Sequence, residues 1–449
     1  MRKIHGGSLQ ALRESNKRLL LERLLAAGDG LTRPELARSL GLTVPAITNL
    51  VSGGGESLAA VLDESPARAH SHRAANSGPI PKVVTLKPRL GYVVGIALSH
   101  TRIQVALADL FGDFDPKTDR RATAWDVEND LHGALAYAAG AVHDLTNARG
   151  ARAEQLAAIG LAIAAPVNVS GGPHPTARRG RLRGHLGNGS PLPWLNIDPV
   201  AALTNHLAAL ADGQRWSSIE LHVDNEANLG ALAELKAGAG RGKQNIIYIQ
   251  VEAAGIGGGL VFNGLNYHGA GGIAGEFGHL VIDPDRPERC RRCGRACVET
   301  IVLTKLGCRN VGSSDRPLDQ IVQAALDNDT NAMAAITDAA NYLGRALAPF
   351  VTLLNFDGVL IGGPFPAQAY SLVVPPIQAA LDGLTNMPEA RDYVVELGAL
   401  HEDASLKGAI WLALDRTRVD YLLRRAAQPE PSSPGSAATV SGGLVATDA

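Results

Sequence analysis

The sequence predicts a small helical module followed by a larger body of the α/β class. Its 449 residues exceed one ordinary domain and suit two or three. Residues 1–90 carry 13 Lys and Arg against 7 Asp and Glu, a net charge of +6 in a chain whose total is −2. Beyond Gly91, short apolar runs alternate with segments of helical periodicity, which is the pattern of an α/β protein.

Composition excludes several other classes of protein. Hydrophobic residues make up 45% of the chain, so it has enough apolar side chains to bury sizeable cores. There is no run of about 18 apolar residues to span a membrane, and the first residues lack the apolar stretch of a signal peptide. We therefore expect a soluble, cytoplasmic protein. Its four cysteines suit a metal site better than a disulfide scaffold.

The first 51 residues have a helix-turn-helix pattern. One apolar stripe at helical spacing consists of Leu9, Leu12, Asn16, Leu19, Leu20 and Leu24. Gly28 to Gly30 end that helix, and Thr32 with Glu35 predicts a capping box for a short helix at 34–40. After Gly41, a second short helix is expected at 44–51. Two short helices around a tight glycine turn are typical of a helix-turn-helix.

Residues suited to DNA gather near the start of the second short helix. Such a helix reads base edges in the major groove with its first residues, while basic side chains hold phosphates. The candidates are Thr43, Pro45, Ala46, Thr48 and Asn49, with Arg33 and Arg38 as phosphate contacts and Ile47, Leu50 and Val51 pointing inward. The positive charge of the module favours a double-stranded DNA partner. A small helical bundle without a nucleic-acid role is the alternative.

Residues 58–88 allow two interpretations. Short strands at 58–62 and 83–86 would enclose a basic loop with Arg68 and Arg73, forming a wing beside the helices. A plain interdomain linker explains the same segment equally well.

The body is expected to contain alternating strands and helices. A hairpin is predicted at Tyr92–Leu98 and Arg102–Asp109, buried strands at 157–164, 246–251 and 359–361, and helices at 131–145, 199–211 and 331–354. The glycine run at 255–259 follows one strand and allows either a phosphate-binding loop or a tight hairpin turn. From about residue 426, the composition turns to Pro, Ser, Gly and Ala, which predicts a disordered tail.

One histidine and three clustered cysteines predict a metal site. His279 precedes Cys290, Cys293 and Cys297, and a Cys₃His set suits tetrahedral structural zinc. Zinc would also stabilise the three thiolates. Glu276 and Glu299 flank the cluster, so they are candidates to bind a polar ligand beside it. Unrelated free thiols in an arginine-rich loop are the alternative.

Carboxylates and amides also gather at a predicted strand-to-helix junction. Asp224, Asn225 and Glu226 come directly before a helical segment. Side chains of this kind suit sugar hydroxyls, which need paired donors and acceptors. Capping of the helix by Asp224 or Asn225 is a second interpretation, and the two do not exclude each other.

These pieces, in this order, resemble the repressor/ORF/kinase (ROK) family. The motifs are the glycine-rich stretch at 255–264, Glu276-x-Gly-His279 and the cysteine cluster that ends in Cys297-Val298-Glu299. The resemblance spans about residues 9–414. It implies a winged helix-turn-helix over residues 1–88 and a two-lobed, sugar-kinase-like body of the actin/hexokinase type over 89–425. The predicted tail is then 426–449.

The resemblance also implies roles for individual residues. Asn225, Glu226, Glu276, His279 and Glu299 are the implied sugar-binding residues. His279, Cys290, Cys293 and Cys297 are the implied ligands of a structural Zn²⁺.

Two departures from the family kinases predict that the chain is not an enzyme. In those kinases the position of Glu226 is a catalytic Asp, and an early phosphate motif reads Asp-x-Gly-x-Thr. Ala97 and Ser99 replace its Asp and Gly here. Because phosphoryl transfer depends on positioning and charge stabilisation, these losses should be severe.

The sequence thus predicts a sugar-responsive DNA-binding transcriptional regulator, a repressor of carbohydrate-metabolism genes. Its partners would be a double-stranded operator, a sugar or sugar-phosphate effector, and further copies of itself in a homodimer or homotetramer. An ATP-dependent sugar kinase with an accessory DNA-binding domain is the alternative. A sugar-binding scaffold that another protein recognises is a third interpretation.

Overall fold

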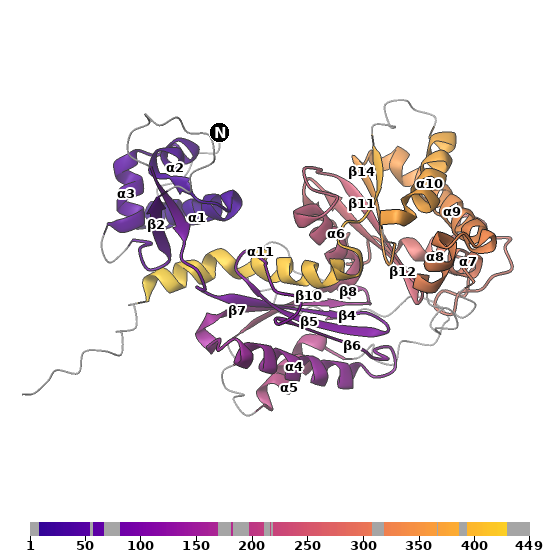
Figure 1. Cartoon of the computed structure of the whole chain (residues 1–449), viewed down its shortest axis with the longest axis horizontal. Coiled ribbons are helices and arrows are strands. Elements are labelled where there is room, and N and C mark those ends of the chain that lie inside the picture. The colour runs from indigo at the N-terminus through magenta and orange to yellow at the C-terminus, as the bar shows by residue number, and fades with distance from the viewer. Residues whose placement is uncertain are drawn as a thin grey trace, which may run out of the picture. The chain divides into compact units, whose positions relative to one another are not determined.

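The computed structural model describes residues 9–53, 57–66, 81–168, 181–182, 197–210, 216, 219–307, 318–365, 367–385 and 393–428. The chain divides into two compact units. The first consists of Met1–Leu90 with Val419–Ala449, and the second of Gly91–Arg418. Figure 1 shows the elements of both. Within the described residues, no helix is both long and apolar enough to cross a membrane.

The first unit contains three helices and a small antiparallel sheet. The helices are α1 (Leu9–Ala27), α2 (Arg33–Leu40) and α3 (Val44–Ser52), and the strands are β1 (Leu31–Thr32), β2 (Leu62–Pro66) and β3 (Lys82–Leu86), in the order β1-β3-β2. The predicted capping box of Thr32 and Glu35 begins α2. Gly41 ends α2 with φ 65°, where glycine carries no steric cost. Leu36, Ile47 and Val51 are buried in the core of this unit.

Two details of this unit correct the sequence prediction. Leu9, Leu12 and Leu19 are exposed, while Leu21 is buried beside Leu20 and Leu24, so only the second half of α1 packs on the core. Residues 58–61 form a turn, and the strand predicted at 58–62 begins at Leu62 instead. The predicted wing strands do pair with each other. The basic loop between them, with Arg68 and Arg73, lies outside the described residues.

The second unit contains two five-stranded sheets with the same strand pattern. The first sheet has the order β10-β7-β4-β5-β6, from β4 (Tyr92–Leu98), β5 (Arg102–Asp109), β6 (Arg120–Ala124), β7 (Leu156–Ile163) and β10 (Glu220–Asn225). The second has the order β13-β12-β11-β14-β15, from β11 (Ile246–Glu252), β12 (Gly255–Phe262), β13 (Leu265–Asn266), β14 (Gly358–Gly362) and β15 (Val394–Leu397). Each begins with an antiparallel hairpin and a third antiparallel strand, and two parallel strands then join its other edge. This repetition defines two α/β lobes.

Helices cover the sheets and complete the two cores. The first lobe carries α4 (Leu131–Ala148) and α5 (Pro199–Ala208). The second carries α7 (Val298–Lys305), α8 (Leu318–Leu326), α9 (Thr330–Leu354) and α10 (Tyr370–Leu384), with α6 (Glu226–Ala237) on the other face of its sheet. A two-stranded sheet pairs β8 (Val167–Asn168) with β9 (Arg181–Leu182). The strands and helices predicted for the body are confirmed, with shifts of a few residues at their ends.

The last helix, α11 (Ala404–Ala427), packs closely on the first sheet. Gly95 of β4 and Gly160 of β7 are register partners, and both face α11. A Cβ atom at Gly160 would lie 1.9 Å from the carbonyl oxygen of Ala409, so only glycine permits this approach.

The end of α11 belongs to the first unit. The Asp420 side chain pairs with Arg18 of α1, and the Tyr421 hydroxyl donates to the Leu90 carbonyl at 2.8 Å. The helix also includes residues 426 and 427, which the composition had assigned to the tail, while residues 429–449 lie outside the described part.

Candidate functional site

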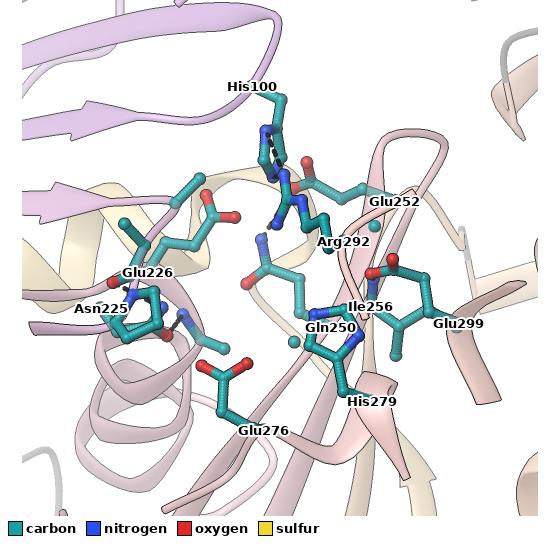
Figure 2. Close-up of a pocket in the computed structure, with 16 residues that line it drawn as sticks. His100, Asn225, Glu226, Gln250, Glu252, Ile256, Glu276, His279, Arg292 and Glu299 are labelled. Atoms are coloured by element: carbon teal, nitrogen blue, oxygen red, sulfur yellow. Dashed lines mark hydrogen bonds between the residues drawn. The ribbon is translucent and has the colours of Figure 1, made fainter. Parts of the chain in front are cut away.

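A cleft of about 500 Å³, including its open mouth, lies where strand ends of the first lobe meet the β11–β12 hairpin of the second. The first lobe contributes the turn after β4, the segment after β7 and the end of β10, and the second contributes β11, the start of β12 and the segment of the cysteine cluster. All five predicted sugar-binding residues line it: Asn225, Glu226, Glu276, His279 and Glu299 (Figure 2).

Asn225 serves mainly as the N-cap of α6. Its Oδ1 accepts bonds from the amides of Ala227 at 2.9 Å and Asn228 at 3.3 Å, and its Nδ2 donates to the Ala165 carbonyl at 3.0 Å. The capping interpretation is therefore confirmed for Asn225, although the residue also lines the cleft. Asp224, directly before it, accepts a bond from His268 at 2.7 Å and is not in the cleft lining.

Two carboxylates of the cleft have few or no donors among the described residues. The buried Oε2 of Glu226 has no hydrogen-bond partner, and no donor among the described residues bonds to Glu276. Burial raises the pKa of both carboxyl groups. For Glu226 the charge of Glu252 raises the pKa further, against a smaller opposing effect of Arg292. Acceptors of this kind are satisfied when a ligand supplies hydroxyl or amine donors.

Glu299 joins the cleft wall to the cysteine cluster. Its Oε2 accepts the amide N–H of Ile256 at 3.0 Å, and its Oε1 lies 3.8 Å from the Cys290 sulfur. Its side chain is buried at the start of α7. Glu299 is thus held by protein donors, unlike Glu226 and Glu276.

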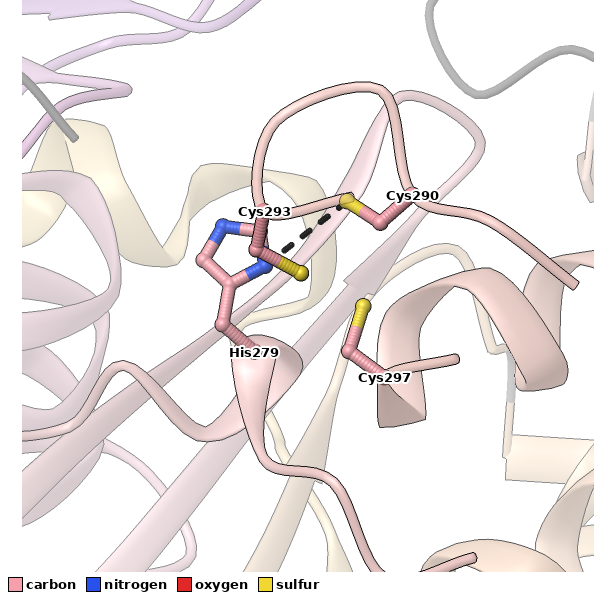
Figure 3. Close-up of side chains that lie close together, drawn as sticks. All are labelled: His279, Cys290, Cys293 and Cys297. Atoms are coloured by element: carbon pink, nitrogen blue, oxygen red, sulfur yellow. Dashed lines mark hydrogen bonds between the residues drawn. The ribbon is translucent and has the colours of Figure 1, made fainter. Parts of the chain in front are cut away.

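The four predicted metal ligands come together in one cluster (Figure 3). One ligand atom from each of His279, Cys290, Cys293 and Cys297 lies within 4.8 Å of all the others. The turn between Cys290 and Cys293 closes through the amide of Gly294, which bonds the Cys290 carbonyl at 2.9 Å with φ 70° at the glycine. A closed Cys₃His donor set matches the ligands of a structural tetrahedral metal. The cluster can therefore hold a metal ion.

Four polar residues of the cleft were not predicted from the sequence: His100, Gln250, Glu252 and Arg292. Gln250 and Glu252 end β11, and the carboxyl ends of sheet strands are where α/β proteins place ligands, so this signal was available. Arg292 lies between the first two cysteines and contacts the His100 ring at 3.4 Å. Nothing in the spacing of the cysteines alone indicates where its side chain points.

The two predicted phosphate motifs have a different structure. The glycine run at 255–259 forms the first part of strand β12, which pairs with β11, and the turn of this hairpin lies just before it at residues 253–254. A phosphate contact by the run stays a prediction. Its glycines permit close packing, since a Cβ at Gly259 would lie 2.5 Å from the Ala227 carbonyl oxygen. At the degenerate early motif, the Ser99 amide donates to the Arg102 carbonyl at 3.0 Å and closes a tight turn.

In the first unit, α3 presents most of the predicted DNA-contacting side chains. Thr43, Pro45 and Asn49 are exposed, and Ala46 and Thr48 are half-buried, whereas Ile47, Leu50 and Val51 point inward as predicted. The Thr43 hydroxyl accepts the Ala46 amide and caps the helix.

Arg33 makes contacts within the first unit that the sequence did not predict. Its guanidinium makes two hydrogen bonds to Glu64 of β2, at 2.7 and 2.9 Å, and donates to Thr48 at 3.0 Å and Ser52 at 3.2 Å. These contacts occupy the fork that a phosphate would need. The structure therefore gives Arg33 the role of joining α2, α3 and β2, and the phosphate contact stays a prediction.

Two lobes of this topology around an acidic cleft define the class of sugar-kinase-like α/β proteins. The model of the ROK family matches residues 93–416, and the chain belongs to this family. The xylose repressor of Bacillus subtilis (strain 168) is 22% identical over 408 residues, which cover 90% of this chain and 96% of that protein. A glucokinase of Halalkalibacterium halodurans is 31% identical over 208 residues, which cover 42% of this chain and 62% of the glucokinase.

Among solved structures, a ROK family transcriptional regulator described as a homolog of the Escherichia coli MLC protein has the same fold. It superposes with a TM-score of 0.67 at 21% sequence identity. The match covers 93% of this chain and 99% of that one. It therefore reaches beyond the part of the chain that the ROK model matches.

Proposed function

We propose that this protein is a sugar-responsive, DNA-binding transcriptional regulator that acts as a repressor. The single observation that carries the effector half of this proposal is an acidic cleft lined by Glu226 and Glu276, in which the buried Oε2 atom of Glu226 has no hydrogen-bond partner among the described residues. Buried polar groups are normally hydrogen-bonded, so unsatisfied acceptors in a cleft mark a place for a ligand rich in donors. A sugar supplies several hydroxyl donors on one rigid ring. The relatives with sugar names are consistent with this ligand.

The DNA half of the proposal rests on the first unit. It has the elements of a winged helix-turn-helix, with α3 as the recognition helix and the β2–β3 pair as the base of the wing. Thr43, Pro45 and Asn49 are exposed along the first two turns of α3, where base contacts are made. The positive net charge of residues 1–90 suits a polyanion. The match to the xylose repressor covers most of the chain, whereas the match to the glucokinase covers less than half.

The mechanism we propose couples these two halves. Two or four copies of the chain bind a pseudo-palindromic operator, with one recognition helix in each major groove. Sugar binding favours one arrangement of the two lobes and thereby changes the affinity for DNA. Coupling of this kind amounts to about 1–3 kcal/mol.

Zinc is the metal we propose for the Cys₃His cluster. The ion would hold His279, Cys290, Cys293 and Cys297 in fixed positions, and its chemistry there would be structural because protein ligands fill all four positions. His279 and Glu299 both belong to the cleft lining and contact Cys290, so the metal would fix one wall of the sugar site.

The alternative is an ATP-dependent sugar kinase, which the glucokinase relative favours. Loss of the acidic residue at Ala97, and Glu226 in place of the catalytic Asp, argue against it. An assay of ADP release across common hexoses and amino sugars separates the two functions. Clear sugar-dependent turnover would refute the proposal that the protein is a repressor with no enzymatic activity.

The proposed function is tested by two measurements on the full-length chain. A gel-shift titration with the DNA upstream of its own gene should show specific binding that weakens steeply with salt, because counterion release dominates such affinity. A thermal-shift screen against sugars and sugar phosphates should find one ligand that stabilises the fold. That ligand should then change the gel shift. No retention of any upstream fragment, or a flat salt response, contradicts the proposal.

A further inference from the structure

The cleft has an excess of acidic side chains. Its described lining contains the glutamates Glu226, Glu252, Glu276 and Glu299 but one arginine, Arg292. Two histidines, His100 and His279, also line it. A phosphate dianion at this place would face several carboxylates in a partly desolvated site, where charge repulsion is strong. The lining therefore favours a neutral or positively charged ligand over a phosphorylated one.

The charge of one of these carboxylates acts on another. Glu226 at the start of α6 and Glu252 at the end of β11 reach the same part of the cleft (Figure 2). The charge of Glu252 raises the pKa of Glu226, and this repulsion outweighs the attraction of Arg292. Burial raises the pKa of Glu252 as well. Repulsion between neighbouring carboxylates in one cleft is relieved when they share a proton or receive a cation.

The two arginines whose charges affect this pair make their contacts with other residues, although the Nη2 atom of Arg102 has no hydrogen-bond partner in the described part of the chain. Arg292 contacts the His100 ring at 3.4 Å and lies 4.0 Å from Glu128. Arg102, whose charge reaches Glu252, pairs with Glu402. Glu252 Oε1 accepts one bond, from Gln250 Nε2 at 2.7 Å, and the buried Oε2 of Glu226 accepts none. Among the described basic residues, none forms an ion pair with either carboxylate. The pair thus has room for a cationic donor.

We propose that Glu226 and Glu252 form a subsite for a protonated amino group of the effector, so that the effector is an amino sugar with a free amine. This inference rests on the proposed function, because it takes the cleft as the effector site. An ammonium group brings three N–H donors and one positive charge, and it can bond both carboxylates at once. Hydrogen bonds between charged groups are about twice as strong as neutral ones. A neutral hydroxyl at the same place would not offset the repulsion between the two carboxylates.

The test is isothermal titration of the full-length, metal-containing protein with matched sugars at slightly acidic pH. The gluco, galacto and manno series are each measured as the parent hexose, the 2-amino sugar, the N-acetylated amino sugar and the hexose 6-phosphate. In the series that binds, the free amine should bind about fivefold or more tightly than the parent. The N-acetylated form should lose this gain because it carries no charge, and the phosphate should bind more weakly than the parent.

Two variants locate the effect. Glu252→Gln removes the charge but keeps an acceptor for Gln250, so the affinity ratio of amine to parent should fall to near one. Glu402→Gln is the matched control: it removes a carboxylate whose charge reaches Glu252 but which does not line the cleft. The ratio should persist in this control. If the affinity ratio falls equally in both variants, the preference for the amine comes from the general negative charge around the cleft. That result would overturn the subsite.

The outcomes separate this inference from the proposed function. Parent hexoses that bind as tightly as their amines, or a 6-phosphate that binds best, would overturn the ammonium subsite and leave the sugar regulator intact. If Mg²⁺ or Ca²⁺ stabilises the protein and the amino sugars bind no more tightly than their parents, the two carboxylates form a metal site. That result would also overturn the ammonium subsite. Failure of every sugar in all three series would remove the proposed effector, and the subsite with it.

Discussion

Replacing Gly160 by alanine should strongly destabilise the second unit. The added Cβ would lie 1.9 Å from the carbonyl oxygen and 2.7 Å from the carbonyl carbon of Ala409 in α11. Real Cβ atoms stay at least 3.0 Å from such neighbours, so the helix must move by more than 1 Å. The obstacle is helix backbone and not the tip of a flexible side chain. Overpacking of this kind costs about 3 kcal/mol.

The assay is thermal or urea unfolding of the full-length protein, and the matched control is Gly140→Ala. Gly140 lies inside α4, and a Cβ there meets nothing within 4 Å. Alanine should therefore stabilise α4 by about 0.5–1 kcal/mol, because it has the better helix propensity. For a lobe of this size, 3 kcal/mol corresponds to a midpoint lower by roughly 6–12 °C. A Gly160→Ala midpoint equal to or above that of wild type would refute the close-packing argument.

Three further predictions concern DNA, metal and pH. Asn49→Ala should weaken specific operator binding by about 1–3 kcal/mol in a gel shift and leave non-specific binding nearly unchanged, whereas Arg38→Ala should weaken both. Cys293→Ser should lose the metal, measured by elemental analysis, and lower the unfolding temperature. Cys308→Ser should do neither, and full metal content in the first variant would contradict the cluster. Hydrogen bonding to Asp224 raises the pKa of His268, although burial opposes it. Its stabilisation is therefore complete below about pH 6.5 and is lost as the pH rises through the higher folded-state value. Arg416 is the other charged group that affects this histidine. In His268→Gln, stability measured from pH 6 to 9 should lose this dependence; an unchanged profile would disprove the linkage.

Much of the fold could be predicted from local sequence signals. The hairpin of β4 and β5 follows from two short apolar runs, and the capping box before α2 follows from cap chemistry; both signals act within a few residues. The exposure of the first half of α1 could not be predicted in this way. Its leucines repeat at helical spacing, but only Leu20, Leu21 and Leu24 pack on a core. The glycine run at 255–259 was ambiguous for a similar reason. Its glycines serve contacts with α6, which are distant in the sequence.

The site divides in the same way. The family resemblance implied the five sugar-binding candidates that line the cleft, and residue types and spacing predicted the four residues of the metal cluster. The contacts of single side chains depend on partners from distant parts of the sequence, which no motif indicates. Arg33 carries the charge of a phosphate contact but meets Glu64 from a later strand. Glu252 became part of the cleft only because the β11–β12 hairpin lies opposite the end of β10.

The sharing of α11 has a practical consequence for engineering. Because residues 419–427 belong to the same compact unit as residues 9–90, a gene fragment cut after residue 90 would encode an unfinished module. Its Arg18 and the Leu90 carbonyl would lose the partners that Asp420 and Tyr421 supply. A chimera that joins the first unit to another protein must therefore include both ends of the chain.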